Sequence, residues 1–164
     1  MPYITLILAW LVQITLSPYL KFNLVHPDLI LIVTISWIIL RGWDEGLSLA
    51  LFAGLCLDFT SATPFGVFTV TMFMVALAAD LIHDRIFGRT NLAMPAMLIL
   101  PITILFYAIA LTLLRGLGRP LTPEIAFVNI IMPAAFLNTV VMLPIFGCLY
   151  LLNRWFRVNN AVTL

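Results

Sequence analysis

Charged residues are scarce in this 164-residue sequence. Lys, Arg, Asp and Glu together make up 9% of it, whereas hydrophobic residues make up 63%. A soluble globular domain carries about 25% charged residues, and the mean hydropathy here is +1.15. The composition therefore excludes a soluble enzyme or binding domain, because only lipid tolerates so much apolar surface. The net charge of +1 gives no electrostatic attraction to nucleic acid, so we expect no nucleic-acid partner.

Cysteine and catalytic motifs are also scarce. The two cysteines, Cys56 and Cys148, have no Cys or His nearby at metal-ligand spacing. We expect two small buried thiols rather than a disulfide or a metal site. Asp80, His83 and Asp84 are interpreted as a solvated helix end rather than a metal site. The sequence holds no nucleophile elbow, zinc-protease motif, P-loop or dinucleotide-binding glycine pattern, so we expect no enzyme, no cofactor and no metal.

Long uncharged runs dominate what is present. They cover residues 1–20, 29–40, 46–57, 59–79, 90–114 and 125–153. Four of them have the roughly 20 residues that cross about 30 Å of hydrocarbon, whereas the second and third reach only about 18 Å as helices. With their flanking residues among the headgroups, 24–43 and 44–60 form two short spans. Otherwise 29–57 forms a re-entrant hairpin covered by protein.

We predict an all-α, polytopic membrane protein with one transmembrane domain over residues 1–164. The six expected helices cover residues 2–20, 27–42, 45–60, 64–83, 94–114 and 127–153. Residues 1–20 have no positive n-region and no cleavage site, so they are interpreted as a retained membrane anchor. With the N-terminus inside, the cytoplasmic segments hold five basic residues (Arg41, Arg85, Arg89, Arg154, Arg157) and the outer segments three (Lys21, Arg115, Arg119). This bias predicts that both termini are cytoplasmic.

Asp58 stands out because it lies in the last turn of the predicted helix 45–60, where the helix dipole disfavours an anion. Thr63 suits the N-cap of the next helix and Pro64 its first position. The free backbone N–H groups of that helix start can compensate the carboxylate. We interpret Asp58 as a structural clasp between two helices, in preference to a proton relay or an ion site.

Small residues follow one face of the same helix. Gly46, Ala50 and Gly54 are spaced by four positions, which lets another helix approach its backbone closely. The stripe predicts close helix packing, either within the bundle or against a partner protein. The sequence leaves both alternatives open.

Two further patterns predict ordinary helix structure. In His26-Pro27-Asp28, the proline suits the first turn of helix 27–42, and the aspartate complements its positive end. In the last predicted helix, Asn129 and Asn138 flank Pro133. We interpret these asparagines as interhelical hydrogen-bonding groups at a kink rather than as a ligand pocket.

These motifs together resemble the bacterial rod shape-determining MreD family. The resemblance rests on Pro27-Asp28 at the start of the second helix, Gly54-Leu55-Cys56-Leu57-Asp58 at the end of the third, and Pro64-Phe65-Gly66 before the fourth. It covers about residues 24–85; beyond them, only the length and the hydrophobicity agree. Gly54, Asp58, Pro64 and Gly66 carry over as structural motif positions, and no catalytic residue carries over.

The resemblance implies a non-catalytic subunit of the rod complex in the inner membrane. Its expected partners are MreC, a single-span protein, and through it the glycosyltransferase RodA, a penicillin-binding transpeptidase and, indirectly, the MreB filament, besides membrane lipid. The implied fold is similar to the six-helix substrate-binding components of energy-coupling-factor vitamin transporters.

A vitamin-type substrate-binding component of such a transporter is the competing function. Those proteins dock through an Ala-x-x-x-Ala pattern in their first helix, whereas Ala9 here is flanked at that spacing by Thr5 and Gln13. The loops and helix ends also show no obvious set of polar ligand-binding residues. Both observations favour the rod complex.

Overall fold

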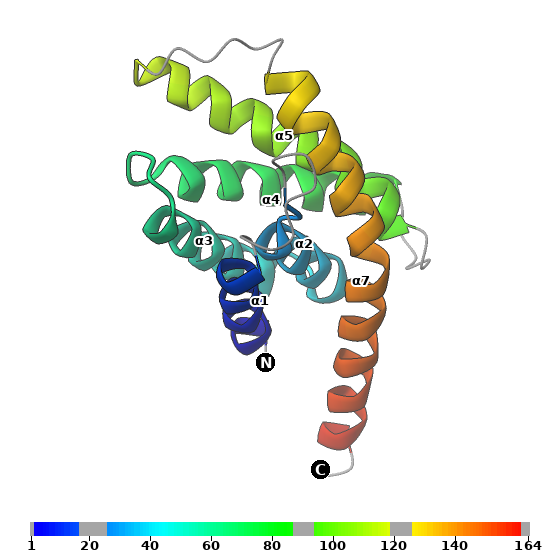
Figure 1. The fold of residues 1–164 in the computed structure, drawn as a ribbon. Helices are drawn as coiled ribbons and strands as arrows, with labels where there is room; N and C mark the ends of the chain where they lie inside the picture. Colours follow the sequence, from blue (N-terminus) through cyan, green and yellow to red (C-terminus); the bar gives the residue numbers. More distant parts are fainter. Residues whose placement is uncertain (1, 17–25, 87–93, 119–125, 162–164) are drawn as a thin grey trace.

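The computed structural model describes residues 2–16, 26–86, 94–118 and 126–161, and all regular structure in these ranges is helical. The elements are α1 (Pro2–Leu16), α2 (Leu29–Arg41), α3 (Trp43–Thr60), α4 (Val67–Ile86), α5 (Met94–Gly116), the π-helical turn η1 (Phe127–Ile131) and α7 (Met132–Ala161). Figure 1 shows the other α-helices gathered around α2, with the end of α7 extending beyond them. The described residues therefore agree with the predicted all-α fold.

Helix α2 forms the core of the bundle. All ten residues from Ile30 to Ile39 are buried, and α2 contacts α1, α3, α4, α5 and α7. A helix that is apolar on every side is stable only when other helices surround it. Its two hydroxyls bond within the helix, since Thr34 donates to the carbonyl of Ile30 and Ser36 to that of Ile32, each at 2.7 Å.

Side-chain hydrogen bonds show how α1 and α2 run past each other. The indole N–H of Trp37 donates to the hydroxyl of Thr5 at 2.8 Å, and the backbone N–H of Ile30 donates to the amide oxygen of Gln13 at 3.1 Å. The start of α1 thus meets the end of α2, and the end of α1 meets the start of α2. The two helices are antiparallel.

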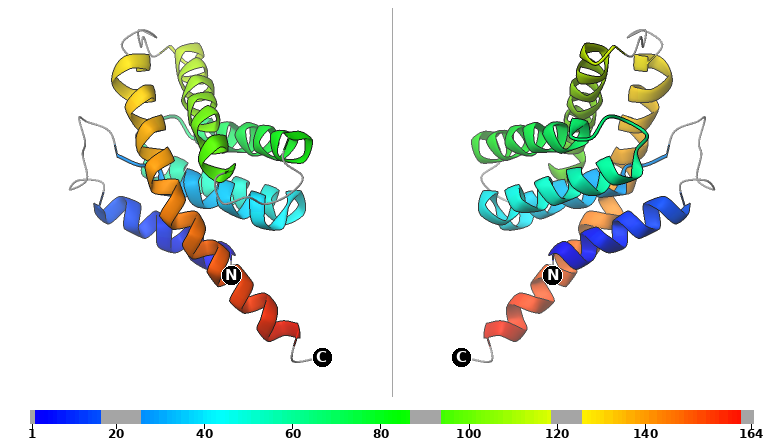
Figure 2. Two further views of the ribbon diagram at one scale, coloured as in Figure 1. Left: turned by 90° about the vertical axis from the view of Figure 1, so that its right-hand side faces the viewer. Right: turned by 90° about the vertical axis from the view of Figure 1, so that its left-hand side faces the viewer.

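Hydrogen bonds between α2 and α7 likewise show that the end of α7 lies at the same end of the bundle as the start of α1. Asn138, early in α7, accepts a bond from the backbone of Asp28 at the start of α2, whereas Asn153, late in α7, accepts one from Arg41 at the end of α2. We call the end of the bundle with Thr5, Arg41 and Asn153 the terminal end, and the end with Asp28 the distal end. The start of α1 and the end of α7 both lie toward the terminal end; Figure 2 shows these two helices.

Helices α2 and α3 are joined by one residue, Gly42, whose φ of 79° is left-handed. Across this turn Arg41 forms a salt bridge of 3.0 Å with Glu45, and its guanidinium lies 5.3 Å from the ring centroid of Trp37. The observed bounds match the expected helices 27–42 and 45–60 closely. Residues 29–57 therefore form two separate helices. Helix α2 is only about 20 Å long, which is shorter than the roughly 30 Å of hydrocarbon in a bilayer.

The start of α4 differs from the prediction. Pro64 was expected at the first helical position, with Thr63 as the N-cap, whereas α4 begins at Val67. Gly66 has a φ of 99°, and its carbonyl accepts the first helical bond, from the N–H of Val70 at 3.0 Å. Residues 61–66 form the turn instead, because glycine reverses the chain there at no steric cost.

Two prolines shape the last helices without ending them. Pro101 lies inside α5 and Pro144 inside α7. The π-helical turn η1 ends at Ile131, two residues before Pro133, whose missing N–H and ring prevent a regular α-helical bond at that point. The structure places a π-helical turn just before Pro133, where the sequence predicted a kink.

Two segments, Pro95–Gly116 and Phe127–Phe156, are long and apolar enough to cross a membrane, and shorter apolar helices cover Pro2–Thr15, Leu29–Arg41 and Val67–Ile82. Large apolar side chains also point outward from α1 and α7, among them Ile4, Leu8, Leu11, Phe136, Val140, Leu143 and Leu151. Contact with acyl chains accounts for such a surface, whereas water does not. The helices and their outer surface are consistent with the predicted membrane protein.

Candidate functional site

Asp58 joins the end of α3 to the start of α4. Its Oδ1 accepts a bond from the backbone N–H of Phe68 at 2.9 Å. Its Oδ2 accepts bonds from the N–H of Thr69 at 3.0 Å and from the hydroxyl of Thr69 at 2.5 Å. These are free N–H groups of the first turn of α4, so the carboxylate caps α4 from another helix. The structure places the expected bonds between Asp58 and the start of the next helix at Phe68 and Thr69, three residues further along the chain than a helix start at Pro64 implied.

Gly54 makes this clasp possible. A Cβ atom at Gly54 would lie 2.4 Å from the Cα of Thr69 and 3.0 Å from the carbonyl oxygen of Phe68. Backbone atoms cannot yield as a flexible side chain can, so only glycine allows α3 and α4 to come this close. Asp58 lies one turn further along the same face, at the distance its carboxylate needs. The glycine and the aspartate therefore act as one structural unit.

The stripe of Gly46, Ala50 and Gly54 faces the inside of the bundle. All three residues are buried, and a Cβ atom at Gly46 would lie 2.7 Å from Cγ1 of Ile38 in α2. Gly46 thus packs against α2 and Gly54 against α4. The stripe packs helices of this chain against each other.

Asp28 has a different role from the one its sequence position suggested. It occupies the N-cap position of α2 but makes no side-chain capping bond. Its carboxylate instead accepts a hydrogen bond from the hydroxyl of Tyr107 in α5. The N–H groups at the start of α2 bond elsewhere: that of Asp28 donates to Asn138 at 2.8 Å, and that of Ile30 donates to Gln13.

Asn138 extends this polar network into α5. Its amide N–H donates to the hydroxyl of Thr103 at 3.2 Å, and Asn138 and Thr103 are both completely buried. One side chain thus holds α2, α5 and α7 together, which confirms the predicted interhelical bonding for Asn138. Asn129, predicted to act in the same way, lies on the exposed surface of η1.

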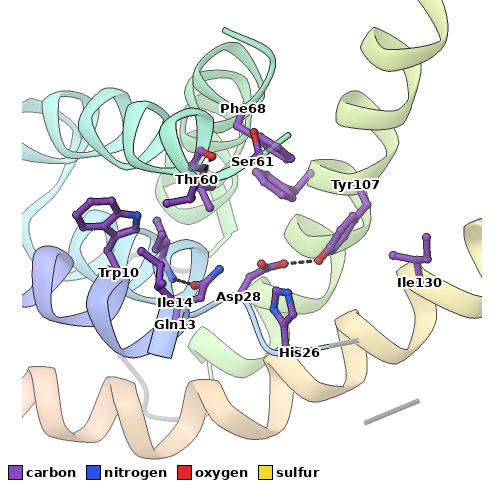
Figure 3. Close-up of a pocket in the computed structure, with 13 residues that line it drawn as sticks. Trp10, Gln13, Ile14, His26, Asp28, Thr60, Ser61, Phe68, Tyr107 and Ile130 are labelled. Atoms are coloured by element: carbon purple, nitrogen blue, oxygen red, sulfur yellow. Dashed lines mark hydrogen bonds between the residues drawn. The ribbon is translucent and has the colours of Figure 1, made fainter. Parts of the chain in front are cut away.

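A pocket of about 610 Å³ opens beside this network at the distal end. Figure 3 shows Asp28 and Tyr107 pointing toward each other inside it, with His26 next to Asp28. Six elements (α1 to α5 and η1), the residues before α2 and the turn after α3 supply its thirteen described lining residues, namely Trp10, Gln13, Ile14, His26, Asp28, Ile30, Leu57, Thr60, Ser61, Phe68, Phe106, Tyr107 and Ile130. Sequence reasoning found no such polar set, because its members come from separate helices.

The remaining predicted residues lie around these features. Pro27 precedes α2, and Pro64 is exposed in the turn before α4. Cys56 is buried as expected, but Cys148 is exposed, because its face of α7 points outward; both are free thiols. In the described part of the chain, no three Asp, Glu, His or Cys residues are placed to hold a metal ion. The side chains of His83 and Asp84 lie outside the described residues.

An all-helical membrane protein with internally clasped helices is the class that this fold and site define. A family model for the rod shape-determining protein MreD matches residues 1–156. The chain therefore belongs to the MreD family and is a membrane component of the machinery that determines rod shape. No curated protein and no solved structure matches it.

Proposed function

We propose that this protein is a non-catalytic scaffold subunit of the rod complex in the bacterial inner membrane. Its direct partner is a MreC-like single-span protein, which links it to RodA, to the penicillin-binding transpeptidase and, indirectly, to MreB. The observation that carries the proposal is the match to the MreD model over residues 1–156. It extends over nearly all the described helices, including α5 and α7, where no motif had been recognised.

The polar and small residues bond and pack within the bundle, and this supports a binding role. Asp58, Asn138 and the stripe from Gly46 to Gly54 all hold helices of this chain together. The partner-facing surface consequently belongs to the outward faces of the bundle. Helix association inside lipid depends on close packing rather than on a hydrophobic driving force, so a rigid bundle offers a partner a surface of fixed shape.

The proposed orientation places both termini and Arg41 in the cytoplasm, and hence the distal end with its pocket on the outer side of the membrane. The excess of basic residues in the expected cytoplasmic segments supports this orientation.

One observation favours the competing function of small-molecule capture for a transporter, namely the pocket beside Asp28. The first helix argues against it. Thr5 and Gln13, which replace the alanines of the transporter docking pattern, bond inward to Trp37 and Ile30 of α2. Residues that bond inward in this way are not available for docking onto a transport subunit.

Affinity purification of the tagged protein from native membranes separates the two functions. The scaffold function predicts recovery of a MreC-like protein, together with RodA or its transpeptidase, identified by mass spectrometry. It also predicts that depletion of the protein turns rod-shaped cells round. Recovery of a transporter ATPase and its membrane subunit, without any rod-complex protein, would overturn the proposal.

A further inference from the structure

The pocket at the distal end has the size and walls of a small-molecule site. Its volume of about 610 Å³ lies within the range of about 300–1,000 Å³ that is typical of ligand pockets. Aromatic rings from three helices face it, namely Trp10, Phe68, Phe106 and Tyr107. Such walls suit the apolar part of a ligand.

Two residues that line this pocket each carry a polar atom without a partner. Nε1 of Trp10 and Nδ1 of His26 are buried and form no hydrogen bond. Within the described ranges they are the only such buried side-chain atoms, and both belong to residues that line this one pocket. Buried polar groups are bonded in the great majority of cases, and an unpaired one is costly. Figure 3 shows the indole nitrogen of Trp10 on the side of the ring that faces the other lining residues.

The charge of the lining restricts the ligand. Asp28 is the one acidic residue among the thirteen described lining residues, and none of them is Lys or Arg. A phosphate or carboxylate group would face a buried carboxylate, with no lysine or arginine among these described residues to compensate it. The Trp10 indole can only donate a hydrogen bond, whereas a histidine nitrogen donates or accepts according to its tautomer. A hydroxyl group satisfies both, because it accepts one bond and donates another.

We propose that this pocket binds an uncharged amphiphile. Its hydroxyl or amide group bonds to Trp10 and His26, and its apolar part lies against Phe68, Phe106 and Ile130. Two sources share this chemistry: a membrane lipid with an uncharged polar group, and a water-soluble molecule with hydroxyl groups and an apolar part. The inference rests on the pocket alone and stands whether or not the protein is a scaffold.

The first test removes a single donor. In Trp10→Phe the aromatic ring remains but the N–H group is lost, so the unliganded protein should unfold at an unchanged or slightly higher temperature. Trp155→Phe is the matched control, because Trp155 is 60% exposed and lies outside the pocket. The probe is monoolein, an uncharged lipid with two hydroxyls, added to protein in phosphatidylcholine nanodiscs. Maltoside detergents are avoided because their own hydroxyls would compete.

Thermal unfolding followed by circular dichroism is the measurement. Monoolein should raise the unfolding temperature saturably, whereas oleoyl lysophosphatidylglycerol, which is anionic, should not. Trp10→Phe should weaken the apparent affinity for monoolein about five- to tenfold, the effect of one hydrogen bond of about 1 kcal/mol, while Trp155→Phe leaves it unchanged. No saturable rise with monoolein, or an equal rise with the anionic lipid, would overturn the proposal.

A second measurement identifies the natural source. Ile130→Trp narrows the pocket, and Val128→Trp, on the exposed surface of the same η1 turn, is its control. Protein extracted from native membranes with a styrene–maleic acid copolymer should carry one uncharged molecule that Ile130→Trp loses and Val128→Trp keeps. Partition of that molecule into chloroform indicates a lipid, and partition into water indicates a soluble metabolite. Equal retention of the molecule by both variants would contradict the proposed binding site, and so would recovery of an anionic molecule. A side chain of a partner protein found in the pocket would contradict it as well.

Discussion

Asp58 and Thr69 lie eleven residues apart and are joined twice, since Oδ2 of Asp58 accepts bonds from both the backbone N–H and the hydroxyl of Thr69. One turn earlier in α3, Gly54 faces the Cα atom of the same threonine. The glycine brings the helices together, and the aspartate then bonds the N–H groups that the start of α4 leaves free. This arrangement gives a physical reason for the spacing of four between Gly54 and Asp58.

Loss of the Asp58 carboxylate should loosen the hairpin of α3 and α4. Asp58→Ala leaves the N–H groups of Phe68 and Thr69 without a partner, at a cost of about 1–3 kcal/mol in the free energy of unfolding. Asp58→Asn should be intermediate, because one amide oxygen still accepts while the amide nitrogen faces a donor. Thermal unfolding in detergent measures both. An unchanged unfolding temperature for Asp58→Ala would refute the clasp and favour a proton or partner role.

Gly54 and Gly147 form a matched pair for testing close helix approach. A Cβ atom at Gly54 would overlap the backbone of Thr69, whereas one at Gly147 in α7 would meet nothing within 4 Å. Gly54→Ala should therefore destabilise the protein by about 1–3 kcal/mol through overpacking. Gly147→Ala should stabilise it by up to about 1 kcal/mol, the difference in helix propensity. Similar unfolding temperatures for the two variants would show that α3 and α4 are not in close contact.

Tyr107 should stabilise the fold through its hydroxyl. It donates to the carboxylate of Asp28, which is only 8% exposed, and Tyr107→Phe removes that donor. We expect a loss of about 1–3 kcal/mol in unfolding free energy, measured by thermal unfolding. Tyr150→Phe is the control, because Tyr150 is 38% exposed on α7 and should tolerate the change. If both variants unfold alike, the bond between Tyr107 and Asp28 contributes nothing to stability.

The sequence predicted most of this fold because the deciding signals are local. Runs of apolar residues between charges located the helices, and the isolated charge of Asp58 pointed to a compensating helix start. The start of α4 was misplaced by three residues, since proline signals a helix start in general and nothing local showed that Gly66 would turn the chain first. The inward direction of the Gly46 to Gly54 stripe also depended on neighbours that no local pattern specifies.

The pocket depended on long-range contacts and was missed for that reason. Gln13, Asp28 and Tyr107 each occur alone in an apolar stretch, and each has an ordinary interpretation there. Only the packing of α1, α2 and α5 brings them to one end of the bundle. Asn138 was recognised as an interhelical group because a buried amide in lipid needs a partner, yet its bonds to Asp28 and Thr103 required the structure.

The orientation in the membrane gives the last prediction. Thr5 and Asn153 lie at the terminal end, whereas α5 returns toward the distal end, because α4 starts there beside Asp58 and the two helices pack together. In the proposed orientation the terminal end lies in the cytoplasm and the distal end on the outer side. A green fluorescent protein fused after residue 164 should then fluoresce, and alkaline phosphatase fused after Gly118 should be active in the periplasm. The two reporters exchanged between these positions serve as the control, and both should then be silent. Phosphatase activity at residue 164 would place the termini outside and the pocket on the cytoplasmic side.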